Sequence, residues 1–380
     1  MPTSPNTPPQ PNRRLYVSEG GVHLYSSLPT VMRPSDLYTI KENPHLKGVV
    51  EHCNIYLITA RARIFVDPSL FTFEGGVMGG SFIVAREHGP ERVGFGWTVL
   101  GNPFGDGTPV HDVAVAQNGT QVALIDASGR GTMVPVLRLV AEARSALTDA
   151  DRDLEVLYVG QGIGRSKQRT ALDRLLNHST LQRILADAVT LMPNMEILLL
   201  LYRFEHHKKI MSTGGDLMAE PIATPDEELA HMRRMSDATI PRPGRIALAE
   251  AALIRYFQPH YNVQIKQSDF AARQKLGILK QVLKADLTGV LVEICSANIR
   301  SRLQTTSAPP RDMREIFSPE MLAGGALEDP EHKKEWQEQL QQMAHSHFAN
   351  FALTTPQERD TFMHGTLWHG SDKRSGPFAM

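Results

Sequence analysis

Four side chains with complementary chemistry follow one another through the middle of the chain. Tyr158 lies near the end of a β-branched and aromatic run. Arg174 and His178 come on the next predicted helix, and Glu250 lies on a later one. The planar fork of an arginine suits phosphate oxygens. A cation and a carboxylate on facing helices, beside a tyrosine at a strand end, suit phosphodiester chemistry.

The first half of this set would be placed by a strand and the helix after it. Residues 154–159 are predicted to form a strand, which stops at the glycine-rich turn 160–164. A helix is predicted over about 170–188, with an apolar stripe along one face. Arg174 and His178 are four residues apart, which puts them on the same helical face, one turn from each other.

Glu250 and the segment after it complete the set. A helix predicted over about 245–257 carries Glu250 among alanine, leucine and isoleucine. A carboxylate in such a setting either faces solvent or has a function. The chain then continues Pro-His-Tyr-Asn and ends this segment at Asn262. The interval of 262 − 250 = 12 residues lets the helix finish before the chain folds back.

These residues, in this order, resemble the GIY-YIG nuclease domain over roughly residues 154–264, under a third of the chain. The matching features are the Tyr158-Val159-Gly160 strand, Arg174, His178, Glu250 and Asn262 after a Pro-x-Tyr sequence. The resemblance implies an α+β fold with a small mixed sheet and flanking helices. A β-rich N-terminal module and an α/β C-terminal region would accompany it.

The resemblance also implies an activity and a role for each residue. It predicts a metal-dependent endonuclease that hydrolyses phosphodiester bonds of nucleic acid, and we expect DNA. Glu250 would be the sole protein ligand of one Mg²⁺ or Mn²⁺ ion. Arg174 would clamp the non-bridging oxygens, and Tyr158 would orient or deprotonate the attacking water. His178 would act as an acid or base or would hold the phosphate.

Contacts to nucleic acid are expected from Gly160, Lys167, Arg169 and Asn262. The family's first signature, a Gly-Ile-Tyr strand just before the Tyr-Val-Gly strand, is not found at that place. The segment upstream offers a predicted strand at 136–140 and a charged loop, with no tyrosine. The identity of the general base is therefore open.

Periodicity and turn signals divide the rest of the chain. Short strands are predicted at 54–59, 61–67, 81–86, 93–99 and 121–126. Beyond the nuclease-like domain we predict a helix at 276–283, a strand at 289–295 and a helix at 330–348. The expected organisation is a disordered lead-in at 1–14, a β-rich module at 45–132, the nuclease-like domain at 133–268 with an insertion at 205–239, a C-terminal α/β region at 269–365 and a mobile tail at 366–380.

Composition bounds the class of protein. With 41% hydrophobic and 21% charged residues, the chain is typical of a soluble globular protein. A formal charge of −1 excludes coating of nucleic acid by bulk electrostatics but leaves room for a local basic groove. Two cysteines, Cys53 and Cys295, favour a reducing cytoplasm. The longest apolar run, 197–202, is too short to span a bilayer, so we expect no membrane partner. A protein partner or self-association would use the N-terminal or C-terminal region.

Competing motifs fit less well. The glycine-rich turn lacks the G-x-G-x-x-G spacing, because Arg165 stands three residues past Gly162, and no Walker loop follows. Three hypotheses stay open: an active nuclease, an inactive relative that grips nucleic acid through Arg165, Lys167, Arg169 and Arg174, and an interaction protein whose match is accidental. Convergence of the four side chains on one groove, with another tyrosine in the missing place, would favour the first.

Overall fold

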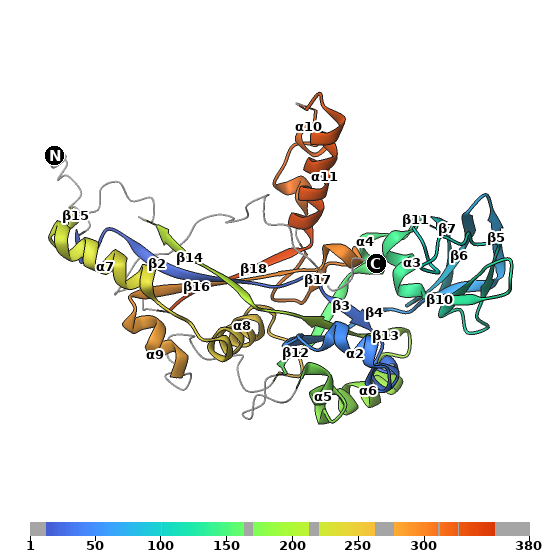
Figure 1. The fold of residues 1–380 in the computed structure, drawn as a ribbon, viewed down its shortest axis with the longest axis horizontal. Helices are drawn as coiled ribbons and strands as arrows, with labels where there is room; N and C mark the ends of the chain where they lie inside the picture. Colours follow the sequence, from blue (N-terminus) through green and yellow to red (C-terminus); the bar gives the residue numbers. More distant parts are fainter. Residues whose placement is uncertain are drawn as a thin grey trace, which may run out of the picture.

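The structure is a computed structural model that describes residues 13–99, 101–162, 170–212, 220–262, 277–310, 312–325 and 327–353 (Figure 1). Helices and several β-sheets are interleaved along the chain, as expected for the α+β class. Nearly all of the predicted lead-in and the whole of the predicted tail lie outside the described residues. No helix in the described ranges has the length and apolarity needed to cross a membrane.

A five-stranded sheet at the centre collects strands from most of the chain. Its order is β17 (Leu303–Gln304), β12 (Leu154–Gln161), β4 (Ile55–Ala62), β13 (Met195–Tyr202) and β3 (Thr30–Met32). β4 runs antiparallel to both of its neighbours, β12 and β13. β4 lies within the predicted β-rich module at 45–132, but it is the strand next to the one that carries Tyr158.

Helices cover both faces of this sheet (Figure 1). One face packs against α1 (Asp36–Glu42), α2 (Pro44–Val50), α5 (Ala171–Leu175) and α6 (Ser179–Leu191). The other face packs against α8 (Arg242–Phe257). Strand side chains alternate between the two cores, since Tyr56 and Ile58 join the first and Leu57 joins the second.

The prediction of one continuous helix over 170–188 is wrong. α5 ends at Leu175 and α6 begins at Ser179, because His178 takes an extended backbone with φ −94° and ψ 105°. Its Nδ1 accepts a hydrogen bond from the Leu181 N–H at 3.1 Å and caps the new helix. Arg174 and His178 therefore lie on different helical segments rather than one turn apart on a single face.

The β-rich module has a core of its own. Its strands are β5 (Ile64–Glu74), β6 (Val77–Arg86), β7 (Gly89–Thr98) and β11 (Arg144–Ser145) in one sheet, and β8 (Asp112–Val115), β9 (Gln121–Ile125) and β10 (Gly131–Pro135) in another. The buried residues of this core all fall between Ile64 and Leu147. The module thus lies between β4 and β12 in the sequence, although those two strands are hydrogen-bonded neighbours.

The predicted strand at 136–140 is also wrong. Residues 136–142 form the helix α3 (Val136–Glu142), which begins directly after Pro135. Val136, Leu139 and Val140 are buried at the three- and four-residue spacing of a helix, and they close the core of the β-rich module. A five-residue apolar run does not distinguish strand from buried helix by periodicity.

A third sheet carries the remaining strands. Its order is β14 (His206–Ser212), β2 (Glu19–Tyr25), β16 (Leu287–Cys295) and β18 (Ser346–Ala352). The described part of the predicted insertion at 205–239 contains β14, the short β15 (Glu220–Pro221), which pairs with β1 (Arg13–Arg14), and α7 (Pro225–Asp237). The helix predicted at 276–283 is α9 (Gly277–Lys284).

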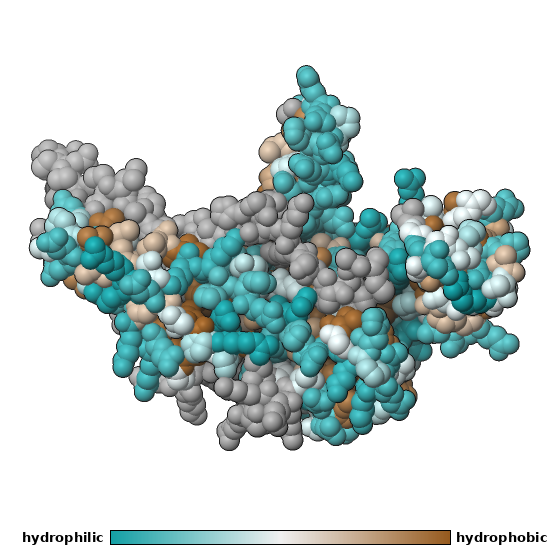
Figure 2. All heavy atoms as spheres, in the orientation of Figure 1, coloured by the Kyte–Doolittle hydropathy of each residue, from teal (hydrophilic) through white to brown (hydrophobic). Residues whose placement is uncertain are grey.

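An arm made of α10 (Pro319–Leu322) and α11 (Pro330–Ala344) rises from this region (Figure 1). The helix predicted over 330–348 ends at Ala344, and the following residues form β18. Leu340 is buried, whereas Trp336 packs edge-on against Phe317 and donates to the Met321 carbonyl at 2.6 Å. The surface of the arm is predominantly hydrophilic (Figure 2).

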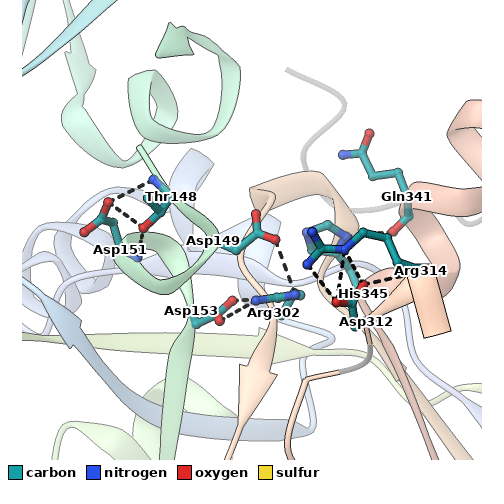
Figure 3. A network of polar contacts seen from close by, with 9 residues as sticks. All are labelled: Thr148, Asp149, Asp151, Asp153, Arg302, Asp312, Arg314, Gln341 and His345. Atoms are coloured by element: carbon teal, nitrogen blue, oxygen red, sulfur yellow. Dashed lines mark hydrogen bonds and ion pairs between the residues drawn. The ribbon is translucent and has the colours of Figure 1, made fainter. Parts of the chain in front are cut away.

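A network of charged side chains fixes the start of β12 (Figure 3). Arg302 donates two hydrogen bonds to Asp153, at 2.9 and 2.7 Å, and lies 3.3 Å from Asp149. Thr148 and Asp151 form a capping box at the short helix α4 (Asp149–Arg152). The bidentate ion pair holds the segment before β17 against the point where the β-rich module returns to the central sheet.

Candidate active site

A β-bulge in β12 determines where Tyr158 points. Val156 pairs with Thr59 and Tyr158 pairs with Ile58, so Leu157 is an extra residue on the β12 side. Val156 belongs to the core under α8, whereas both Leu157 and Tyr158 pack into the core under α5 and α6. Strict alternation would have put Tyr158 on the same side as Val156. The bulge re-aims it to the face that carries Tyr56.

Tyr56 is the residue that the sequence analysis missed. It is fully buried, its ring centroid lies 6.2 Å from that of Tyr158, and it stands opposite Gly160 in the strand register. A Cβ atom at Gly160 would lie 2.5 Å from the Tyr56 hydroxyl and 2.8 Å from Cε1 of Tyr158. Gly160 is therefore required because the two tyrosine rings occupy the space of a side chain. It is itself buried beneath them and does not offer a surface to nucleic acid.

His178 lies edge-on to both rings, with centroid distances of 5.0 Å to Tyr158 and 5.7 Å to Tyr56. Burial lowers the pKa of His178, and the positive charge of Arg174 lowers it further. Because Nδ1 accepts the helix-capping bond, a neutral ring carries its proton on Nε2. His178 is thus a neutral hydrogen-bond donor at the site.

Arg174 reaches the same place from α5. Thr170 and Asp173 form a capping box that fixes this short helix. Burial lowers the pKa of Arg174, but the neighbouring hydroxyls of Tyr56 and Tyr158 and the Glu250 carboxylate outweigh burial and raise the pKa above its ordinary value. The guanidinium is therefore charged and is held among two phenols and a carboxylate.

Burial also raises the pKa of both tyrosines. For Tyr56 the neighbouring Tyr158 adds to the rise and the charge of Arg174 opposes it. For Tyr158 the carboxylate of Glu250 adds to the rise and Arg174 again opposes it. The Tyr56 hydroxyl is enclosed, and although Arg174 and Tyr158 approach it, no contact within the described ranges meets hydrogen-bond geometry.

Glu250 comes to this cluster from the middle of α8. Burial raises its pKa to about 7, against the opposing effects of the Arg174 charge and of hydrogen bonds from Gln161. Its side chain is half-buried. The charge of Glu250 in turn acts on both tyrosines and on Arg174, so the carboxylate lies within electrostatic reach of all three.

Asn262 closes the free edge of β12. Its Oδ1 accepts from the Val159 N–H and its Nδ2 donates to the Val159 carbonyl, both at 2.9 Å. The Tyr261 N–H donates to the Leu157 carbonyl at 3.1 Å, and the Tyr261 hydroxyl donates to Asp187 at 2.8 Å. Both ends of the buried Asn262 amide are thus engaged, so the residue positions the strand rather than meeting nucleic acid, in contrast to the expectation.

The structure therefore brings together Tyr158, Arg174, His178 and Glu250, and adds Tyr56. Lys167 and Arg169, like Arg165, lie outside the described residues. Among the residues that are described, no three histidine, cysteine, aspartate or glutamate side chains gather as a metal-binding group. Glu250 is the carboxylate that lies beside Arg174 and the two tyrosines.

Comparisons with known proteins assign no family to this chain. No protein-family model matches the chain, and no curated protein or solved structure matches it either.

Proposed function

We propose that this protein is a metal-dependent endonuclease with a GIY-YIG-type centre that is split by the β-rich module. The observation that carries the proposal is the meeting of Tyr56 and Tyr158 on adjacent antiparallel strands, with Gly160 beneath the rings. Asn54-Ile55-Tyr56 would stand where the family has Gly-Ile-Tyr. The tyrosine not found next to β12 in sequence would then come from β4.

Arg174 and His178 would bind the scissile phosphate. The guanidinium presents paired donors to two non-bridging oxygens, and its raised pKa keeps it charged. His178, neutral and protonated on Nε2, donates a hydrogen bond to the phosphate or to the attacking water. It does not serve as the general base in this arrangement, because Nδ1 is committed to capping α6.

The two tyrosines would have different tasks because they differ in exposure. Tyr158 is half-buried and can orient the attacking water, whereas the fully buried Tyr56 packs against the ring of Tyr158 and lies beside Arg174. Both phenols stay protonated at neutral pH, since burial raises their pKa. Both hydroxyls would therefore act as hydrogen-bond donors and positioning groups.

Glu250 suits a hard divalent cation such as Mg²⁺ or Mn²⁺. A carboxylate oxygen is the ligand type that these ions prefer, and a pKa of about 7 means that a cation competes with a proton that is easily displaced near neutrality. When bound, the ion would supply positive charge against the charge that develops on the phosphate and on the leaving oxygen.

The alternative is a protein with the same fold that binds nucleic acid without cutting it. The raised pKa of both tyrosines favours this alternative, because neither phenol is ionised at neutral pH to take a proton from water. The two functions share Arg174 as the phosphate contact. They differ in whether Glu250 and a divalent ion are needed for any measurable effect on the nucleic acid.

Cleavage of supercoiled plasmid, and of DNA and RNA oligonucleotides, with Mg²⁺ or Mn²⁺ tests the proposal. Glu250→Ala should lower the rate by about 10²–10³, the usual effect of removing one preorganised charge. Glu335→Ala, an exposed glutamate on α11, is the matched control and should cut like wild type. Equal cutting by Glu250→Ala would overturn the proposal. Binding in the presence of a chelator without cleavage under any condition would support the alternative.

A further inference from the structure

A groove and a pocket adjoin each other where the β-rich module meets the C-terminal region, away from Tyr158 and Glu250. The groove, of about 800 Å³, is walled by β7 and β11 on one side and by α11 and the 3-10 turn η1 (Ala297–Ile299) on the other. The pocket, of about 200 Å³, lies between α3, β3 and η1. The two share Ala141, Glu142 and Asn298 as lining residues, so they adjoin each other at these three residues.

The groove is positively charged. Arg144 and Arg300 line it from opposite walls, both are exposed, and neither forms an ion pair with another residue of the described ranges. The acid in the groove, Glu142, is already engaged by Arg138 at 2.7 Å and by the Trp97 indole at 3.0 Å. Two uncompensated guanidinium groups facing one space favour an anion, and their planar forks suit phosphate.

Arg300 holds an unfavourable backbone conformation at this place. Its φ of 45° lies in the left-handed region, which L side chains adopt rarely. It directly follows η1, and a glycine would meet the same backbone requirement without strain. Strained backbone conformations of non-glycine residues occur preferentially at ligand sites, so this conformation suggests that the Arg300 side chain contacts a ligand.

The pocket offers a different chemistry from the groove. Its walls include the apolar side chains of Val31, Leu137 and Ile299. The Nδ2 of Asn298 donates to the Pro29 carbonyl at 3.0 Å, whereas its Oδ1 is buried and meets no donor among the described residues. Asn298 lines the pocket beside these apolar side chains, and a small pocket with apolar walls and a few polar groups at its edge suits a flat ring.

We propose that this site binds a nucleotide, with the base in the pocket against Asn298 and the phosphate in the groove between Arg144 and Arg300. The same chemistry is offered by a free mononucleotide and by one nucleotide of a single strand. The second source rests on the proposed nuclease function, for which the site would hold the substrate at a distance from the cleavage centre. The first source is independent of that function.

Calorimetric titration of the full chain in a chelating buffer tests the proposal with adenosine monophosphate, ribose phosphate and a short single-stranded oligonucleotide. Adenosine monophosphate should bind at least about tenfold more tightly than ribose phosphate, because only the former fills the pocket. Arg144→Ala and Arg300→Gly should each weaken binding about tenfold or more, the usual effect of losing a charge-assisted hydrogen bond. Asn298→Leu should bring the affinity for adenosine monophosphate toward that for ribose phosphate.

The variants are chosen so that misfolding cannot imitate a binding defect. Glycine relieves the left-handed φ at position 300, so Arg300→Gly should melt no lower than wild type while it loses affinity. Arg233→Ala, an exposed arginine on α7, is the control and should bind like wild type. A preference for the oligonucleotide over the mononucleotide that both Arg144→Ala and Arg300→Gly abolish would identify a strand as the ligand of this site. A preference for the mononucleotide would identify a free nucleotide.

Two results would overturn this inference: equal affinity for adenosine monophosphate and ribose phosphate, or wild-type affinity in both arginine variants. Each is independent of the nuclease proposal, because binding is measured without divalent ions and away from Glu250. If the protein binds the nucleotide as expected but never cuts nucleic acid, this inference holds and the nuclease proposal fails. If cleavage depends on Glu250 but no nucleotide binds at this site, the nuclease proposal holds and this inference fails.

Discussion

Replacing Gly160 with alanine should disturb the tyrosine pair directly. The new Cβ would lie 2.5 Å from the Tyr56 hydroxyl oxygen and 2.6 Å from Cζ, and ordinary contact needs about 3.5 Å, so the ring must move by about 1 Å. Tyr56 is fully buried, so its ring can move only by displacing the side chains packed around it. We expect a loss of stability of about 1–3 kcal/mol, as is usual for overpacking. A misplacement of about 1 Å should also slow cleavage by about 10²-fold.

Thermal unfolding and plasmid nicking measure the two effects separately. At about 2–4 °C per kcal/mol, Gly160→Ala should melt several degrees below wild type. Gly94→Ala is the matched control, since Gly94 also lies in a β-strand but nothing lies within 4 Å of its added Cβ. This control should melt within about 1 °C of wild type, because surface substitutions usually change stability by no more than about 0.5 kcal/mol.

Two outcomes separate the parts of this reasoning. If Gly160→Ala melts and cuts like wild type, Tyr56 does not occupy the space beside Gly160 and the geometry described for the site is wrong. If it melts lower but cuts at the wild-type rate, the packing is right but the tyrosine pair has no part in the reaction.

Three further predictions follow from the contacts and pKa shifts at the site. Because burial raises the pKa of Glu250 from 4.5 to about 7, its protonation favours the folded state, so wild type should lose stability as the pH rises between these values. Without divalent ions Glu250→Gln should then be more stable than wild type above pH 7, by up to about 3 kcal/mol. Mg²⁺ should raise the melting temperature of wild type but not that of Glu250→Gln. Asn262→Ala leaves the buried N–H and carbonyl of Val159 unpaired, so the free energy of unfolding measured with denaturant should fall by about 2–4 kcal/mol. An unfolding free energy equal to that of wild type would refute this prediction. His178→Asn keeps the cap on α6 and should unfold like wild type, whereas His178→Ala should lose about 1 kcal/mol of folding stability. Slow cleavage by both variants would show that Nε2 takes part in the reaction. Full activity of His178→Asn would show that the residue serves only as a helix cap.

The chemistry of the site was more accessible from the sequence than its geometry. Arg174, Glu250 and Tyr158 were singled out by residue type and order, and the structure brings them together. Tyr56 was quoted within a strand but was assigned to another module, because 158 − 56 = 102 residues separate the two tyrosines. Pairing between strands that far apart depends on the folding of everything between them, and no local pattern reports it.

Local patterns failed where a single residue overrides them. The apolar periodicity continues from α5 into α6, and nothing in it indicates that His178 leaves the helical region to cap the next helix. The sequence also gives no indication of the bulge at Leu157, because Val156, Leu157 and Tyr158 are all acceptable strand residues. Asn262 was expected at the nucleic acid because the sequence does not show that β12 has a free edge for its amide to cover.

The β-rich module leaves the central sheet at the end of β4 and returns at the start of β12, where the strands are already partners. Its buried residues form a separate core, against which Ala62 at the end of β4 packs. The tyrosines lie toward the opposite ends of the same two strands. Such an insert can be lengthened, shortened or exchanged for another domain during evolution while the paired strands and their side chains stay in place. The surface that the chain presents can thereby change without altering the arrangement of the tyrosine pair.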